Sequence, residues 1–167
     1  MSTKETLRLL VIMLAVLAII VLIYIRLSST TVEPIGQSFP IQGQEHIAIG
    51  ATHPEYNSNP PTSGWHYAVP ADWGVYQTEL PDEQLIHNLE HGGIWISYKG
   101  IATTTINQLE NVIRGQPKII VTPRIKDDAP IVLASWGRLE KLQIFDETKI
   151  REFINANRNK SPEPLAQ

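Results

Sequence analysis

The sequence predicts an α+β protein in which one N-terminal transmembrane helix precedes one small mixed-sheet domain with its helices mainly on one face. A long uncharged apolar run near the N-terminus indicates the membrane helix. The rest of the 167-residue chain is long enough for a single domain. In that domain the predicted order is strand, helix, strand, helix, three strands and a helix. This order combines one strand–helix–strand crossover with hairpin-linked strands, which favours a mixed sheet.

The apolar run extends from Leu9 to Ile25 (LLVIMLAVLAIIVLIYI), and Arg8 and Arg26 flank it. As a helix it would be roughly 25 Å long, slightly short of a hydrocarbon core of about 30 Å. The flanking arginines can extend their charges to the two interfaces. A cleaved signal peptide is the alternative, but the chain continues IRLSSTTVEP from Ile25, without a small-residue cleavage site. We therefore expect a single-pass anchor over residues 9–25.

The distribution of charge predicts the orientation and excludes one class of partner. Lys4 and Arg8 precede the apolar run, whereas no Lys or Arg lies between Arg26 and Lys99. The positive-inside rule then places residues 1–8 in the cytoplasm and the rest outside the cell membrane. The net charge of −3, without a basic footprint, excludes nucleic-acid binding. The chain has no cysteine, so its external part has no disulfide framework.

Two irregular stretches follow the anchor. Residues 26–42 are rich in Ser, Thr, Pro and Gly and are predicted to form a linker, so that the extracytoplasmic domain comprises residues 43–164. Residues 51–75 contain several prolines and little periodicity. A loop of that length in a compact domain is usually functional.

The remaining helices and strands are predicted from capping residues, apolar periodicity and strand composition. Pro81, Asp82 and Glu83 predict the start of a helix that Gly92-Gly93 ends. The final residues 160–167 (KSPEPLAQ) are expected to fray. The other predicted elements are strands at 46–49, 94–98, 118–121, 131–136 and 138–144, a helix from Thr103 that ends at Gly115, and a last helix capped by Asp146.

The helix over residues 81–91 carries two histidines on the side opposite its leucines. At 100° per residue, His87 and His91 point nearly opposite to Leu85 and Leu89. The histidines therefore face solvent or a polar cover. The polar segment 53–67 (HPEYNSNPPTSGWHY), stiffened by its prolines, is the candidate cover.

This arrangement predicts a metal site. His87 and His91 would form an i,i+4 clamp, and His66 and His53 would be the ligands from the loop. Glu90 would be a fourth ligand, or it would orient a ligating imidazole without binding the ion itself. His46 is the least favoured histidine. The expected cofactor is one divalent transition metal, zinc or copper(II). The methionines are Met1 and Met13, so the external domain offers no sulfur for a soft copper(I) site.

Two alternatives stay open. In the first, the histidines form a structural hydrogen-bonded cluster, and the domain is an interaction module for an envelope protein or glycan. In the second, HNLEH (87–91) matches the H-x-x-E-H pattern of inverted zinc peptidases, and Glu90 would be the general base of a small metal-dependent hydrolase. The domain is too small for the substrate-binding lobes of such peptidases, so an enzyme is not the favoured prediction.

Several of these stretches resemble the bacterial and archaeal family named domain of unknown function 3105. The resemblance implies one N-terminal membrane span and a single unit over about residues 43–164, but it implies no activity. In the family the position of Trp65 is often a proline, a departure that leaves the histidines in place. The matching stretches are GQEHI (43–47), YNSNPPTSGWHY (56–67), Gly74-Val75-Tyr76, HNLEHGGIWISY (87–98), ASWGR (134–138) and PEP (162–164).

Overall fold

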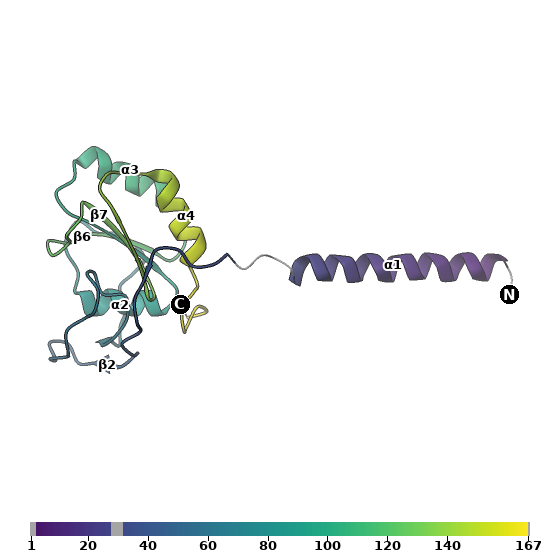
Figure 1. The fold of residues 1–167 in the computed structure, drawn as a ribbon, viewed down its shortest axis with the longest axis horizontal. Helices are drawn as coiled ribbons and strands as arrows, with labels where there is room; N and C mark the ends of the chain where they lie inside the picture. Colours follow the sequence, from purple (N-terminus) through teal and green to yellow (C-terminus); the bar gives the residue numbers. More distant parts are fainter. Residues whose placement is uncertain (1–2, 28–31, 167) are drawn as a thin grey trace. The chain divides into compact units, whose positions relative to one another are not determined.

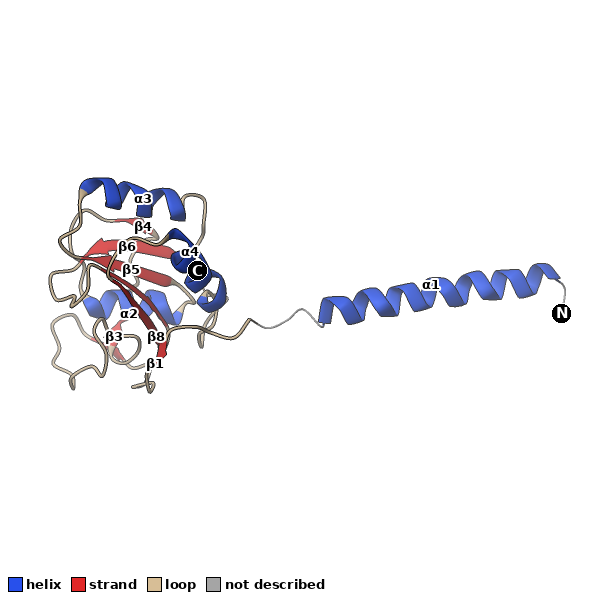
Figure 2. Ribbon diagram, turned by 45° about the horizontal axis from the view of Figure 1, so that its top comes forward, coloured by secondary structure: helices blue, strands red, loops and turns tan. Residues whose placement is uncertain are grey.

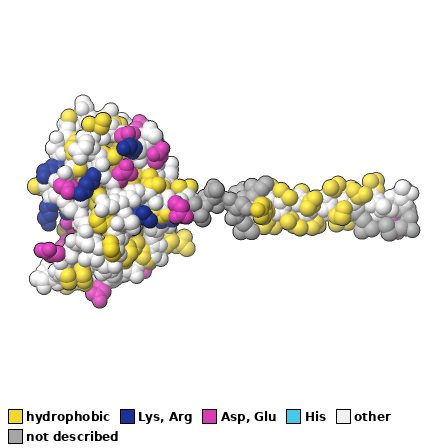
Figure 3. Space-filling view, viewed as in Figure 1, with side chains coloured by type: hydrophobic (Ala, Val, Ile, Leu, Met, Phe, Trp, Pro, Cys, Tyr) yellow, Lys and Arg dark blue, Asp and Glu magenta, His cyan; other side chains and the backbone are white. Residues whose placement is uncertain are grey.

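The computed structural model describes residues 3–27 and 32–166, and the chain divides into two compact units, Met1–Val32 and Glu33–Gln167. The first unit contains one helix, α1 (Thr3–Leu27). Over Thr3–Tyr24 this helix is long and apolar enough to cross a membrane, with a mean hydropathy of 3.0. Its described surface is mostly apolar (Figure 3). By length and composition, α1 fits either a membrane anchor or a signal sequence.

The second unit is built on a six-stranded mixed sheet, which confirms the predicted α+β class. β6 (Ile119–Pro123) pairs in parallel with both β4 (Gly74–Val75) and β5 (Ile94–Tyr98). β7 (Ile131–Ser135) pairs antiparallel with β5 and with β8 (Arg138–Leu142), so the sheet combines two parallel crossovers with a hairpin. A separate two-stranded parallel ribbon joins β2 (His46–Ile47) and β3 (His66–Tyr67). The order of the large sheet is β1 (Gln37–Ser38), β8 (Arg138–Leu142), β7 (Ile131–Ser135), β5 (Ile94–Tyr98), β6 (Ile119–Pro123) and β4 (Gly74–Val75).

The helices of this unit cover both faces of the sheet. α3 (Thr103–Ile113) and α4 (Glu147–Asn157) lie on one side, and α2 (Asp82–Glu90) lies on the other (Figures 1 and 2). The alternation of β5 explains this, because Ile94 and Ile96 pack in the core beneath α3 and α4, whereas Trp95 packs against α2. α3 and α4 therefore cover one face of the sheet, and α2, the helix of the histidine pair, packs on the other face.

Several very short strands escape prediction because two residues show no periodicity. β1 lies within the predicted linker 26–42 and pairs with Leu139 and Arg138 of β8. The backbone N–H of Ile35 donates to Asn157 Oδ1 at 3.1 Å, next to α4. Part of the stretch predicted as linker is thus packed against the sheet.

The expectation that residues 160–167 fray is wrong for the residues that the structure describes. Lys118 Nζ donates to the carbonyl oxygens of His91, Pro164 and Ala166 at 2.9, 2.7 and 3.0 Å. The backbone N–H of Glu163 donates to the carbonyl of Glu90 at 3.1 Å. The composition of the tail gave no sign of these contacts, because their partners are distant in sequence.

A buried arginine links the histidine-bearing loop to the start of α2. The side chain of Arg124 forms two hydrogen bonds with the carboxylate of Asp82, both at 2.8 Å. Its Nη1 also donates to Asn59 Oδ1 at 2.6 Å and to Asp127 Oδ1 at 2.7 Å. Its guanidinium lies 5.7 Å from the ring centroid of Trp95. This network fixes the loop and α2 to the end of β6.

Substitution Arg124→Ala should therefore lower the free energy of unfolding by about 3–5 kcal/mol, because it leaves the buried Asp127 carboxylate without its cation. Urea unfolding of the full chain in detergent measures this loss. The matched control is Arg151→Ala, which removes an exposed ion pair with Glu147 and should cost less than about 1 kcal/mol. Equal losses in the two variants would contradict the structural role of Arg124.

Candidate metal centre

Three imidazoles and one carboxylate come together where α2 meets the β2–β3 ribbon. His46, His66, His87 and Glu90 each offer one ligand atom, and these atoms lie within 4.8 Å of one another. His66, His87 and Glu90 are buried, whereas His46 is exposed. The described residues contain no other group of this kind.

Strand register and helix periodicity bring these side chains together. His46 lies directly opposite His66 in the parallel ribbon, so both rings project from the same side. Their centroids are 4.8 Å apart in an edge-on arrangement. α2 supplies His87 and Glu90 while its Leu85 and Leu89 pack against the sheet. The ring of His46 stacks on that of His87 at 5.1 Å.

Two backbone carbonyls fix the tautomers of the buried rings. His66 Nδ1 lies 2.7 Å from the carbonyl oxygen of Gly64, and His87 Nδ1 lies 2.6 Å from that of Tyr67. A carbonyl oxygen only accepts, so each Nδ1 carries a hydrogen, and each neutral ring has its lone pair on Nε2. Metal-binding histidines are oriented in this way, with the second ring nitrogen donating to a carbonyl or carboxylate.

With its lone pair on Nε2, each ring needs a neighbour that supplies a hydrogen to that atom. His66 Nε2 lies 3.0 Å from Glu90 Oε2, so a proton must be shared between them. His87 Nε2 lies 3.0 Å from His91 Nε2, so His91 must donate from that atom. This leaves His91 Nδ1 as a bare acceptor, and it is buried with no hydrogen-bond partner. A cation among these atoms would satisfy the lone pairs of both His66 and His87.

Burial keeps the rings on α2 in the form that binds metals. Desolvation lowers the pKa of His87, the carbonyl of Tyr67 opposes this, and the neighbouring histidines lower it further. Desolvation also lowers the pKa of His91, against the opposing effect of Glu163. Both imidazoles are therefore held neutral near pH 7, and a neutral imidazole is the ligand.

The structure brings together only some of the residues predicted as ligands. His66, His87 and Glu90 are in the group, and His91 lies beside His87 just outside it. His53 lies elsewhere, with Nε2 3.3 Å from Glu83 Oε1 and Nδ1 2.8 Å from its neighbour's carbonyl. His46, the least favoured histidine, completes the group instead. Its place depends on the pairing of β2, which lies within the predicted strand 46–49, with β3, which the sequence did not predict.

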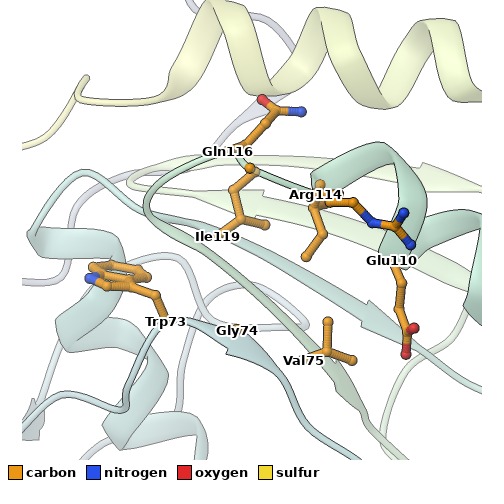
Figure 4. A pocket seen from close by; sticks show the side chains of 9 residues that line it. Trp73, Gly74, Val75, Glu110, Arg114, Gln116 and Ile119 are labelled. Atoms are coloured by element: carbon orange, nitrogen blue, oxygen red, sulfur yellow. The ribbon is translucent and has the colours of Figure 1, made fainter.

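A hollow of about 310 Å³, separate from the histidine cluster, lies at the edge of the large sheet beside β4 and α3 (Figure 4). Trp73 lines one side of it, and Glu110 from α3 and Arg114, which follows α3, line the other. Its lining offers one carboxylate and no imidazole, and Arg114 adds a positive charge. This hollow therefore lacks the donors of a transition-metal site.

A family model described as "Protein of unknown function (DUF3105)" matches residues 49–167. No curated protein and no solved structure matches the chain. The matched range contains His66, His87 and Glu90 and begins just after His46.

The tautomers and pKa directions are open to a direct test by long-range ¹H–¹⁵N NMR of the metal-free full chain in detergent. His87 should be the Nδ1–H tautomer and should titrate below about 6.5, the usual imidazole value. Because the unfolded chain then binds more protons, the stability of the metal-free protein should fall as the pH drops from about 6.5 through the lower folded pKa. An Nε2–H tautomer, or titration above 6.5, would contradict the geometry.

Proposed function

We propose that this chain, which belongs to the family Protein of unknown function (DUF3105), binds one divalent transition metal ion through His46, His66, His87 and Glu90. The observation that carries the proposal is the pair of carbonyl–imidazole hydrogen bonds, which leave the lone pairs of His66 and His87 on Nε2 in two rings of the same cluster. Glu90 supplies a negative charge beside them, and a cation would neutralise it.

The donor set suits zinc or copper(II). Both ions accept imidazole and carboxylate ligands, and the cysteine-free chain offers no thiolate. With zinc–nitrogen bonds of about 2.0–2.1 Å, tetrahedral ligand atoms lie roughly 3.3 Å apart. The present spread of up to 4.8 Å would therefore have to contract on binding. His46 is the exposed member, so its ring has the most room to move.

The location proposed for this site is outside the cell membrane. α1 would be a single-pass anchor, with Lys4 and Arg8 retained in the cytoplasm by the positive-inside rule. The unit from Glu33 onward would then be exposed to envelope metal pools and to envelope proteins.

A second proposed function is an interaction module, favoured by one separate feature. A hollow of about 550 Å³ lies beside the β2–β3 ribbon, lined by Ile47, Ile49, Tyr67 and Val69 among others. Ile49 and Val69 are 86% and 70% exposed, which is costly for apolar side chains unless a partner covers them. The apolar lining suits a protein partner better than a glycan.

Hydrolysis is the least supported proposal. A general base must reach a water molecule, but Glu90 Oε2 is engaged with His66 Nε2, and the carboxylate is among the four clustered donors. Glu90 is therefore better placed to hold an ion than to activate water beside it.

Metal binding is tested by adding Zn²⁺ or Cu²⁺ to the full chain purified without a histidine tag. We expect one bound ion per chain and a higher melting temperature. His87→Ala should weaken binding by about 100-fold or more, since even supporting partners of ligands are worth about 10–100-fold. His53→Ala is the matched control and should bind normally, because its ring lies with Glu83. Melting unchanged by every metal would favour the interaction module.

The orientation is tested with single cysteines, because the natural chain has none. A membrane-impermeant maleimide should label Glu55→Cys in intact cells, since residue 55 is exposed on the unit Glu33–Gln167, which is proposed to lie outside the membrane. Lys4→Cys should react only after the membrane is broken. Labelling of Lys4→Cys in intact cells would reverse the proposed topology, and release of a shortened soluble chain would indicate signal cleavage.

A further inference from the structure

The segment that follows α4 is fastened across the C-terminal end of α2. The backbone N–H of Asn159 donates to the carbonyl of Gly92 at 2.9 Å, and that of Glu163 donates to the carbonyl of Glu90 at 3.1 Å. A side chain at Gly92 would meet Asn159 within 2.8 Å, so the two backbones are in close contact. Lys118 Nζ donates to two carbonyls of the same segment, those of Pro164 and Ala166, and to the carbonyl of His91. The segment therefore has a fixed position beside the histidines.

This position brings the Glu163 carboxylate to the outer side of His91. Glu163 Oε2 lies 3.7 Å from His91 Nε2. The Glu163 side chain is 56% exposed, whereas that of His91 is 10% exposed. The exposed carboxylate of Glu163 and the nearly buried imidazole of His91 are thus two neighbouring metal-binding groups between solvent and the buried centre.

His91 also touches the centre itself. Its Nε2 lies 3.0 Å from His87 Nε2, which would be a ligand of the buried ion. One lone pair binds one partner, so an ion on His87 Nε2 must displace the hydrogen bond from His91. The released ring has Glu163 as its remaining neighbour on that side.

We propose that His91 and Glu163 form an outer metal site through which a divalent transition metal ion passes to the buried centre. This inference rests on the proposed function. A hydrated ion would first exchange a water molecule for the Glu163 carboxylate and another for His91 Nε2, once proton exchange with solvent has moved the hydrogen of that ring from Nε2 to Nδ1. It would then exchange these ligands and its remaining waters for His87 and the inner donors. The Lys118 ammonium opposes a cation here, but its three hydrogen bonds direct it at carbonyls, and Glu90 and Glu163 together outweigh its single charge.

The test is the kinetics of Co²⁺ binding to the full chain in detergent, followed by stopped-flow absorbance, with release measured by a chelator. Glu163→Gln should slow association and release equally, by about tenfold, because steering and relay by one charge affect both directions. The equilibrium affinity should be unchanged. The backbone contacts of residue 163 do not involve its carboxylate, so the fastening of the segment is retained. Glu163→Asp, which keeps the charge, should be slowed less.

The matched control is Glu152→Gln, which changes the net charge equally at an exposed position on α4. Glu163→Gln behaving like this control would overturn the outer site. Weaker equilibrium binding through faster release alone would also overturn it, because Glu163 would then be a resident ligand. If the natural chain takes up no Co²⁺, Zn²⁺ or Cu²⁺ at all, the proposed function fails, and the outer site fails with it.

Discussion

Two hydrogen bonds from imidazole to backbone carbonyl determine what this site can do. Because Gly64 and Tyr67 accept from Nδ1 of His66 and His87, both buried rings have a bare Nε2, which faces Glu90 in the first and His91 in the second. Both carbonyls lie in or next to β3, so one short strand orients its own histidine and one on the facing helix. In the metal-free protein these lone pairs need a shared proton on Glu90 and a donated one from His91. In the proposed metal-bound form, one cation would replace both of these hydrogen bonds.

The rest of the fold holds that strand and helix in position. β3 pairs with β2, which adds His46 directly opposite His66. Leu85 and Leu89 of α2 pack against Trp95 and Ile120 of the sheet. Arg124 joins the loop before β3 to the start of α2, so the two sides of the site do not move independently. A metal site whose ligands lie on such supported elements loses little conformational entropy when an ion binds.

The sequence predicted what depends on local patterns and missed what depends on distant pairing. Pro81 and Gly92-Gly93 mark the ends of α2 closely, and its leucine and histidine faces are opposed as the helical wheel predicts. His46 lies in the predicted strand 46–49, but the pairing that sets it opposite His66 depends on β3, which was not predicted. His53 shares a loop with His66, but the chain turns between them and takes its ring to Glu83. The fixed tail depends on Lys118, far away in sequence, and no local signal announces it.

X-ray absorption of the zinc-loaded full chain tests the central claim most directly, because it reports the ligands of the ion itself. The account predicts nitrogen and oxygen neighbours at about 2.0–2.1 Å, with outer-shell scattering from three imidazoles. The same pattern should persist in His53→Ala and lose one imidazole in His46→Ala. Zinc surrounded by oxygen alone, or an imidazole count that ignores His46, would contradict the proposed centre.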